Sequence, residues 1–501
     1  MGNLIKRAAG RITLRGTLLF LMALSVVVRF VNINGPLWGR HAFRQTQTAL
    51  TVREWLEHGV RVFDYITPVF GPNSCIPFEF PTYQLSCYFL YKWLSFLPSL
   101  DMACILANLI WFFLSAYMIH RILLRLFPED SKVAFYGLAV YMISPYTIYW
   151  SHTCMIDYCS VFFSLGYAEF FTAWLQEGEA KNYILLLFFG CLAYLTKVTT
   201  VLGVVPFIAF FILRDIFVGR DSTASAFGEF LHNPQKVLGI LLAVAIPLGV
   251  GAAWAHYADI IKIASGYPSL TSQALTKWNF GTLEQRMEPR RWLTIIKRIY
   301  YILPAMWGLS LLAFLTVKDK GMRLRCELLA VCAFIPVAVF FNLYYAHDYY
   351  LMSVSPFICA FAGVCFYELE KYLRGASRLV RYLICISLVA SIALPGSYWN
   401  PYFKTKEKYM ASDEWKIVQF VNEETPEKDS VLILGNDWSS HLQYYMQRPA
   451  ATIPEAKGFK LPDMDFRWIV CGKEDSVWLE KYPNRQLEKQ IGKWKVYKIV
   501  Q

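Results

Sequence analysis

Apolar runs long enough to cross a bilayer recur along most of this 501-residue chain, separated by short polar loops. They lie near 17–33, 99–124, 133–150, 157–175, 182–196, 199–213, 237–254, 294–316, 326–343, 349–369 and 382–397. Hydrophobic residues make up 56% of the sequence and the mean hydropathy is +0.35, which is more than a soluble surface tolerates. The pattern predicts a polytopic α-helical membrane protein with about eleven transmembrane helices.

A further, shorter apolar run at 81–97 decides the predicted topology. If it does not cross, the basic loops 121–132, 214–236, 317–325 and 371–381 all share the side of the basic N-terminus. If it crosses, most of these loops lie on the opposite side of the membrane. The parity of the crossings also depends on whether the short run 182–196 crosses. We expect a run that does not cross, a retained first span after Lys6, Arg7, Arg11 and Arg15, a cytoplasmic N-terminus and an outer C-terminus.

The net charge of +12 alone could indicate a nucleic-acid-binding protein. Lys and Arg, however, cluster in the short loops that flank apolar runs, as membrane orientation and anionic headgroups require. We therefore expect membrane lipids and no nucleic acid as partners. The predicted topology places 34–98, 151–157, 255–293 and 346–350 on the same outer face.

From residue 399 the composition becomes that of a soluble domain. We expect a helix near 412–424 with Ser412 as its N-cap, strands at 430–434 and 466–471, a helix near 438–447 and a last strand over 493–500. The chain thus divides into a transmembrane domain over 1–398, with a large first outer loop at 34–98, and a small α/β domain over 399–501 outside the cytoplasm.

The first outer loop is the place where a membrane enzyme would keep its chemistry, because it is long, polar and aromatic. Within it, TQTALTVREWLEHG has apolar residues at helical spacing and Gly59 where a C-terminal cap belongs. We expect this helix to lie flat on the membrane and to present His41, Arg44 and Gln45 at its entry.

Several motifs resemble the GT-C superfamily of integral membrane glycosyltransferases, in its family 39-like branch of protein O-mannosyltransferases and lipid A aminoarabinose transferases. They are HAFRQTQTA at 41–49, EFPTYQ at 79–84, ISPYTIYWSHTCMID at 143–157, LAYLTK at 192–197, HDYYLMSVSP at 347–356 and DWSSHLQYYMQRP at 437–449. The resemblance covers most of the chain. It implies transfer of a sugar, with inversion, from a polyprenyl-phosphate carrier to a lipid, glycan or protein acceptor on the outer face.

The resemblance also implies a carboxylate base in the first outer loop and basic groups on the carrier phosphate. The usual acidic pair at the start of the flat helix is here Arg44-Gln45, and a position that is commonly lysine is Glu79. The two charges look exchanged, so Arg44 and Lys197 are the expected phosphate ligands, and Glu79 and Asp157 are the candidate catalytic carboxylates. The choice of base between these two stays open.

Each of these residues also has a structural interpretation. Glu79 could simply pair with Arg44, Asp157 could cap the helix that follows it, and Lys197 could extend toward the headgroups. The remaining expected substrate contacts are His41, Gln45, His152, His347, Asp348 and Tyr350. A lone histidine is more often a hydrogen-bonded core residue than a ligand, and Tyr350 also fits an interfacial aromatic belt.

We therefore expect an inverting hexosyl or pentosyl transferase in the inner membrane, with a polyprenyl-phosphate sugar as donor and a lipid-linked or envelope acceptor. No metal-binding residues are predicted; a divalent metal held by carboxylates is left open. A transporter or flippase of an anionic lipid-linked sugar is the alternative. A transporter favours charges near the midplane of the membrane, whereas the charges here gather at one face.

Overall fold

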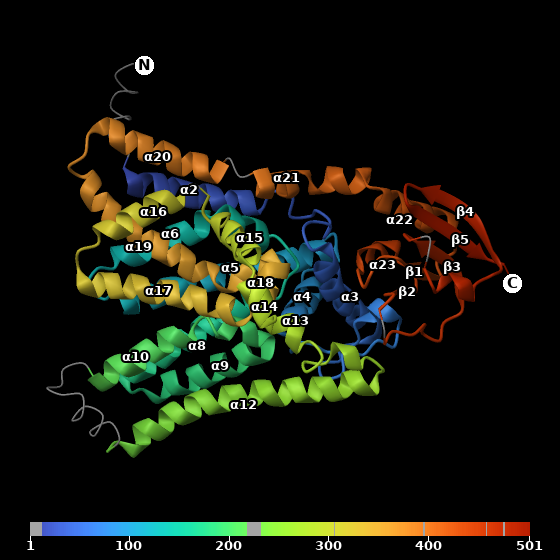
Figure 1. The fold of residues 1–501 in the computed structure, drawn as a ribbon, viewed down its shortest axis with the longest axis horizontal. Coiled ribbons are helices and arrows are strands. Elements are labelled where there is room, and N and C mark those ends of the chain that lie inside the picture. The colour runs from blue at the N-terminus through green and yellow to red at the C-terminus, as the bar shows by residue number, and fades with distance from the viewer. Residues whose placement is uncertain are drawn as a thin grey trace.

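The computed structural model describes residues 13–217, 232–304, 306–393, 396–456, 458–473 and 476–500. Figure 1 shows an elongated molecule, with a bundle of long helices at one end and a small sheet domain, which carries the C-terminus, at the other. The basic residues Lys6, Arg7 and Arg11, and residues 218–231 of the basic loop 214–236, lie outside the described residues.

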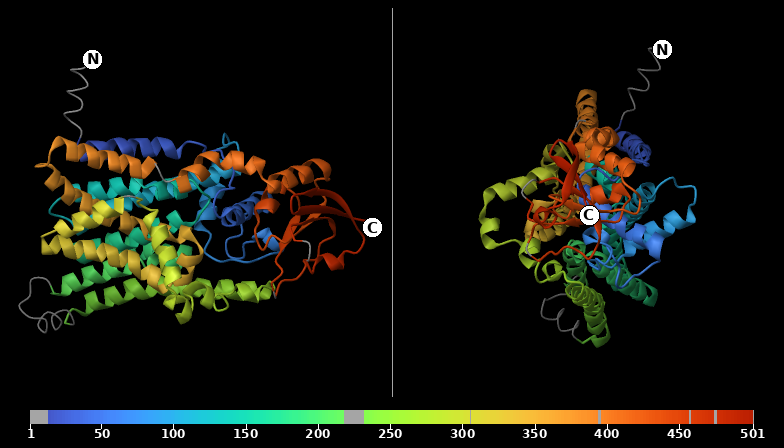
Figure 2. Two further views of the ribbon diagram at one scale, coloured as in Figure 1. Left: turned by 45° about the horizontal axis from the view of Figure 1, so that its top comes forward. Right: turned by 90° about the vertical axis from the view of Figure 1, so that its right-hand side faces the viewer.

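The helices of the bundle run along the long axis of the molecule in both views of its side (Figures 1 and 2). They are α2 Leu14–Arg29, α5 Leu100–Leu126, α6 Lys132–Ile143, α7 Pro145–Ser151, α8 Asp157–Glu177, α9 Ala180–Val201, α10 Val205–Phe217, α12 Pro234–Ala264, α16 Met306–Thr316, α17 Lys320–Val339, α19 Ser355–Leu373 and α20 Arg378–Ala393.

Among the described residues, α5, α9 and α12 are long and apolar enough to cross a membrane by themselves. The predicted number of eleven crossings stays a prediction. The run 81–97 forms α4, Thr82–Trp93. Its 12 residues reach only about 18 Å, less than the roughly 30 Å of hydrocarbon that a span must cross.

Three predicted spans are broken or shifted. The run 294–316 is divided between α15, Pro289–Tyr300, and α16, because Pro304 disfavours helical backbone in the residue before it. The runs 326–343 and 349–369 were predicted as continuous helices. Instead α17 ends at Val339, and a short α18, Phe341–Ala346, and the 3-10 helix η3, Asp348–Ser353, precede α19. Pro356 lies at the first turn of α19, the position in a helix that proline favours.

The predicted flat helix is α3, Ala42–His58. Gly59 caps it with a φ of 91° and donates its N–H to the carbonyl of Trp55, which confirms the predicted end. The helix does not lie with a polar face in water. Thr46 and Gln47 are buried against the C-terminal domain, and Gln45 is buried as well, against Cys154. The apolar side, with Ala49 and Val52, is buried as well.

The C-terminal domain follows a long connecting helix. Its elements are α21 Gly396–Ala411, α22 Asp413–Glu424, β1 Ser430–Leu434, α23 His441–Met446, β2 Ala450–Ile453, β3 Phe466–Cys471, η4 Leu479–Lys481, β4 Arg485–Ile491 and β5 Trp494–Ile499. The strand order is β2-β1-β3-β5-β4, with β1 parallel to β2 and β3, and β5 antiparallel to β3 and β4. The predicted strands and the Ser412 cap on the Trp415 N–H are confirmed.

Both faces of this sheet are covered, as the alternation along β1 shows. Val431 and Ile433 pack into the domain's own core with α22, whereas Leu432 and Leu434 belong to the core that continues from the helical bundle. Side chains that alternate in this way reach both cores. The sheet is therefore packed directly against the rest of the molecule, and the predicted boundary at residue 399 falls within α21.

Candidate active site

Two ion pairs, one half-buried and one buried, lie where the bundle meets the C-terminal domain. Arg44 Nη2 is 2.7 Å from Glu79 Oε1, and Lys197 Nζ is 2.6 Å from Asp157 Oδ1. The four residues come from α3, the loop before α4, α9 and α8, so residues up to 153 positions apart in sequence surround one site. These are the four residues for which the sequence predicted catalysis or phosphate binding.

Backbone contacts hold the first pair in place. Glu79 lies at a bend that precedes Phe80 and Pro81, and the Phe80 N–H donates to the carbonyl of Leu195 at 3.0 Å. The Tyr65 hydroxyl donates to the carbonyl of Glu79 at 2.9 Å. The segment of Glu79 is thereby fastened to α9, two residues before Lys197.

The second pair lies at a break in the helical backbone of α9. Lys197 has extended backbone, with φ −169° and ψ 97°, inside an otherwise helical segment. The Ser160 hydroxyl donates to the Lys197 carbonyl at 3.3 Å. Asp157 is the first residue of α8, yet the N-cap is Ile156 and no side chain caps this helix. The carboxylate of Asp157 is therefore committed to Lys197, and the capping interpretation is wrong.

Two stacked tyrosine rings from η3 lie against Lys197. Tyr349 and Tyr350 have ring centroids 4.7 Å apart and are stacked. Lys197 Nζ lies 4.4 Å from the Tyr350 ring centroid and 5.3 Å from that of Tyr349, within cation–π range. Tyr350 was predicted at the site and Tyr349 was not, because neighbouring tyrosines in sequence do not reveal which rings face a cation.

Asp348 forms a third charged group. It accepts from His41 Nε2 at 2.8 Å through one oxygen and from Arg40 Nη2 at 2.7 Å through the other. His41 has a left-handed backbone, with φ 53°, at the N-cap of α3. Its ring lies 5.0 Å from Tyr349 and 5.1 Å from His347, between centroids. His41, His347, Asp348 and Tyr350, four of the six predicted substrate contacts, thus lie together.

Gln45 and His152 have other surroundings. The Gln45 side chain donates to the carbonyl of Arg40 at 2.9 Å and accepts from the Cys154 N–H at 3.0 Å, so it holds backbone. The His152 ring packs 4.9 Å from Tyr402, and burial lowers its pKa to about 4. Both residues line a small cavity of about 110 Å³ near the end of α2, and none of the four ion-pair residues is among those that line it.

The charge of Glu79 is set by opposing influences. Burial raises its pKa, but the positive charges of Arg44 and Lys197 outweigh this, so the pKa of Glu79 lies below its usual range. A cavity of about 20 Å³, lined by both members of the pair, by Gln84 and by Trp438, has room for about one water molecule. The carboxylate of Glu79 is therefore ionised and lies beside this small cavity.

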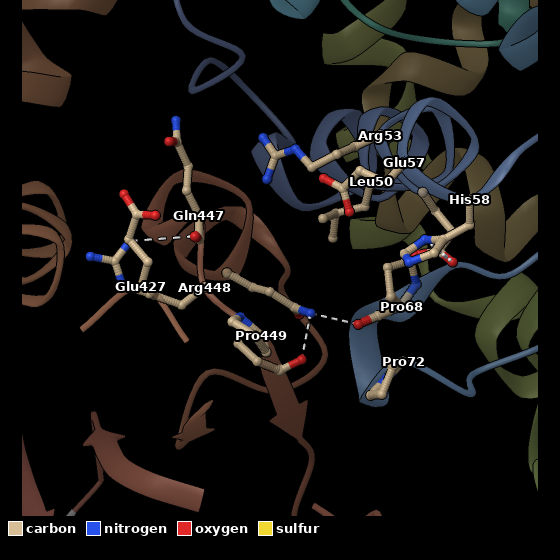
Figure 3. Close-up of a pocket in the computed structure, with 13 residues that line it drawn as sticks. Leu50, Arg53, Glu57, His58, Pro68, Pro72, Glu427, Gln447, Arg448 and Pro449 are labelled. Atoms are coloured by element: carbon tan, nitrogen blue, oxygen red, sulfur yellow. Dashed lines mark hydrogen bonds and ion pairs between the residues drawn. The ribbon is translucent and has the colours of Figure 1, made fainter. Parts of the chain in front are cut away.

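A larger cleft of about 600 Å³ opens at the far end of α3 (Figure 3). Leu50, Arg53 and Glu57 line one wall, and Gln447 and Arg448 of the C-terminal domain line the other (Figure 3). Among the described residues, Glu54, Glu57 and His58 form one group whose potential metal ligands lie within 4.8 Å of one another. It is at the opposite end of α3 from Arg44, so it does not belong to the site of the ion pairs.

Comparison with known proteins gives a consistent picture of the fold. Residues 87–227 match the family described as dolichyl-phosphate-mannose-protein mannosyltransferase. ArnT from Cupriavidus metallidurans, in a crystal structure bound to undecaprenyl phosphate, is similar over 97% of this chain and 99% of its own, with a TM-score of 0.63 and 12% identity. No curated protein matches the sequence.

A second solved structure is the archaeal oligosaccharyltransferase AglB from Archaeoglobus fulgidus, in complex with an inhibitory peptide and a dolichol-phosphate. It is similar over 91% of this chain and 69% of its own, with a TM-score of 0.53 and 11% identity. The chain has the GT-C fold. In this GT-C fold the ion pairs lie at the end of the helices that faces the C-terminal domain, and the resemblance stated from the motifs is confirmed at the level of the fold.

Proposed function

We propose that the protein is a glycosyltransferase that takes a sugar from a polyprenyl-phosphate carrier on the extracytoplasmic side of the inner membrane. The observation that carries this is the convergence of Arg44, Lys197 and two carboxylates at one end of a GT-C fold. The similar proteins are described with undecaprenyl phosphate and dolichol-phosphate, which are anionic lipids of the proposed donor class.

Arg44 and Lys197 are the proposed ligands of the carrier phosphate. Each already neutralises a carboxylate, and Lys197 lies against the stacked tyrosines, which provide an apolar wall for a lipid-linked sugar. A phosphate that enters between the cations shares their charge with Glu79 and Asp157. As the bond from the sugar to the phosphate breaks, its electrons move to a phosphate oxygen, and the two cations stabilise the growing charge.

Glu79 is the proposed base. It removes the proton from the acceptor hydroxyl while that oxygen bonds to the anomeric carbon opposite the leaving phosphate, which inverts the configuration. With Arg44 and Lys197 beside it, the pKa of Glu79 is low and the carboxylate is a weak base. Phosphate binding draws both positive charges toward the carrier and so raises the pKa of Glu79 toward the value that a base needs. Donor binding thus activates the base.

Asp157 then keeps Lys197 charged and oriented, and Asp348 holds His41 near the tyrosines. Burial is the main reason that the pKa of His347 is lowered to about 4. The ring is therefore neutral and can accept a hydrogen bond from a sugar hydroxyl. The acceptor is a hydroxyl of a lipid, glycan or protein. The inner-membrane location, inversion and the outward C-terminal domain are parts of the same proposal.

Binding of undecaprenyl phosphate to the purified protein tests the phosphate site. Arg44→Ala and Lys197→Ala should each weaken binding about tenfold to a hundredfold, the usual cost of a lost charge-assisted contact. Arg61→Ala and Lys416→Ala are matched controls, because these residues pair with Asp64 and Asp413 at exposed positions away from the site. Unchanged binding in both site variants contradicts the assignment. Movement of the lipid across the bilayer without sugar transfer supports a transporter instead.

A further inference from the structure

Segment 276–300 holds the turn that carries Asp348 and Tyr350. It consists of α13 Thr276–Phe280, α14 Leu283–Met287 and α15. Figure 1 shows these helices grouped around α18 at the end of the bundle nearest the C-terminal domain. Asn342 Nδ2 donates to the carbonyl of Trp278 at 2.8 Å, which joins α13 to α18 directly.

Two arginines of the segment bind the ends of two helices. Arg286 Nη2 donates to the carbonyl of Val339 at 2.8 Å, at the end of α17. Arg298 Nη1 donates to the carbonyls of Tyr344 at 2.8 Å and Tyr345 at 2.5 Å, at the end of α18. The last carbonyls of a helix have no partner within it, so a guanidinium satisfies them and also favours the negative end of the helix dipole. Arg298 therefore fixes the backbone immediately before His347.

The opposite side of the segment is apolar and exposed. Trp292, Ile295 and Ile299 of α15 face the protein, whereas Leu293, Ile296 and Tyr300 repeat at the same spacing on an outward stripe. In α14, Leu283 and Met287 are each 76% exposed. A water-exposed loop would not place so many large apolar side chains outward.

The surroundings indicate what covers this surface. The helices that precede and follow the segment in the chain, α12 and α16, also expose large apolar residues, namely Ile260, Ile263, Leu311, Leu312 and Leu315, and both have the apolar composition of membrane helices. Lys277, Arg290 and Lys297 are exposed along the same segment. The right-hand view of Figure 2 shows the yellow-green segment around α15 standing out to one side of the bundle. Apolar side chains flanked by basic ones fit the boundary between acyl chains and headgroup phosphates.

We propose that segment 276–300 is a membrane-docking element whose outward apolar side chains enter the outer leaflet of the bilayer, and that Arg286 and Arg298 thereby hold the Asp348–Tyr350 turn in place. Arg298 acts through that turn and is a positioning residue. The partner is the phospholipid leaflet itself. The proposal deepens the proposed function, since it names what stabilises part of that site, but its test does not depend on sugar transfer.

Spin labels test the lipid contact in the full-length protein reconstituted in phosphatidylcholine nanodiscs. Labels at Met287→Cys and Leu293→Cys should collide more with oxygen, which partitions into lipid, than with a water-soluble nickel chelate. A label at Lys428→Cys, on the exposed surface of the C-terminal domain, should show the reverse. The unsubstituted protein gives the background from native cysteines. Water-type accessibility at both positions overturns the proposal, and so does shielding from both probes, which indicates a second copy or another protein on this surface.

Hydrogen exchange tests the connection to the turn. In nanodiscs, Arg298→Ala should raise the exchange rate of the amides over 340–350 about tenfold to a hundredfold, and Arg298→Lys should restore part of the protection. The paired substitution of Leu293 and Ile296 by Ser should act in the same direction without touching either arginine. Exchange in β1 is the internal control. Unchanged protection of 340–350 in both the Arg298→Ala and the paired variant overturns the positioning role, whatever the transfer activity is.

Discussion

Each carboxylate of the site lies beside a positively charged side chain, so a substitution at either partner changes the charge balance of the pair. Glu79 and Asp157 each accept from one cation at 2.6–2.7 Å, and Asp348 accepts from Arg40 and His41. If one partner is removed from a buried pair, the other is left with an uncompensated charge, which costs more than the pair contributes. Conservative substitutions are therefore the informative ones at this scale.

Glu79→Gln keeps the shape and the hydrogen-bonding capacity of the side chain but removes its basicity. If Glu79 is the base, turnover should fall about 10²–10⁴-fold while undecaprenyl phosphate binding is retained. Asp157→Asn should cost less turnover, because it weakens the hold on Lys197 and should appear mainly as weaker donor binding. Steady-state transfer measured beside carrier binding separates the two. Near-normal turnover in Glu79→Gln would move the role of base to Asp157.

The pH dependence of transfer should follow the charge of Glu79. In the protein without bound donor the cations hold the pKa of Glu79 below the usual range, so the acid limb of kcat/KM, which reports the free enzyme, lies at low pH. In Arg44→Ala, burial acts with less opposition and raises that pKa, so the acid limb should move to higher pH. Arg61→Ala should leave the limb where it is. An unmoved limb in Arg44→Ala would show that another group titrates.

At the scale of elements, α3 is the part that connects the two domains. Thr46 Oγ1 lies 2.8 Å from Ser440 Oγ, and Arg53 Nη1 donates to the carbonyl of Tyr444 at 2.7 Å. The sequence predicted this helix, its apolar spacing and its glycine cap, because these are local properties. It did not predict that the polar side is buried, because the covering residues lie about 390 positions later.

The same distinction explains the other differences. The strands β1, β3 and β5 follow from their apolar composition, whereas β4 has a mostly exposed pattern and β2 has only four residues, so neither gives a clear period. The four charged residues of the site were selected from a resemblance and from their position near span ends. Their pairing, and the break in α9 that presents Lys197, depend on tertiary contacts that no local pattern encodes.

The docking of α3 gives a prediction of its own. Ser440→Ala removes a hydroxyl that also donates to the carbonyl of Phe43 at 3.1 Å, one residue before Arg44. Thr46 is then left buried with one partner fewer, which should lower stability by about 1–3 kcal/mol. Thermal unfolding in detergent measures this. Ser412→Ala, a helix-cap change in the same domain but away from α3, is the control; only Ser440→Ala should also weaken undecaprenyl phosphate binding.

For the whole molecule, the central prediction is the orientation in the membrane. Cysteines introduced at Lys277 and Lys428 should be labelled from outside the cytoplasm, and one at Gly321 only from inside, because the basic loops then lie in the cytoplasm. All three positions are exposed, so poor reactivity does not confuse the result. Labelling of Lys277→Cys from the cytoplasm would place the basic segment 255–293 on the inner side and contradict the predicted topology.

Asp101, at the start of α5, accepts from the hydroxyls of Tyr444 at 2.5 Å and Tyr445 at 2.7 Å. At a synthesis rate of about 5–20 residues per second, Tyr444 leaves the ribosome roughly 17–70 seconds after Asp101, which precedes it by 343 residues. During that time the N-terminal helices are already inserted in the bilayer, but the C-terminal domain that packs against α3 has not yet been synthesised. The newborn protein is therefore expected to stay inactive until its last segment has emerged and docked, so the order of synthesis itself delays the first turnover.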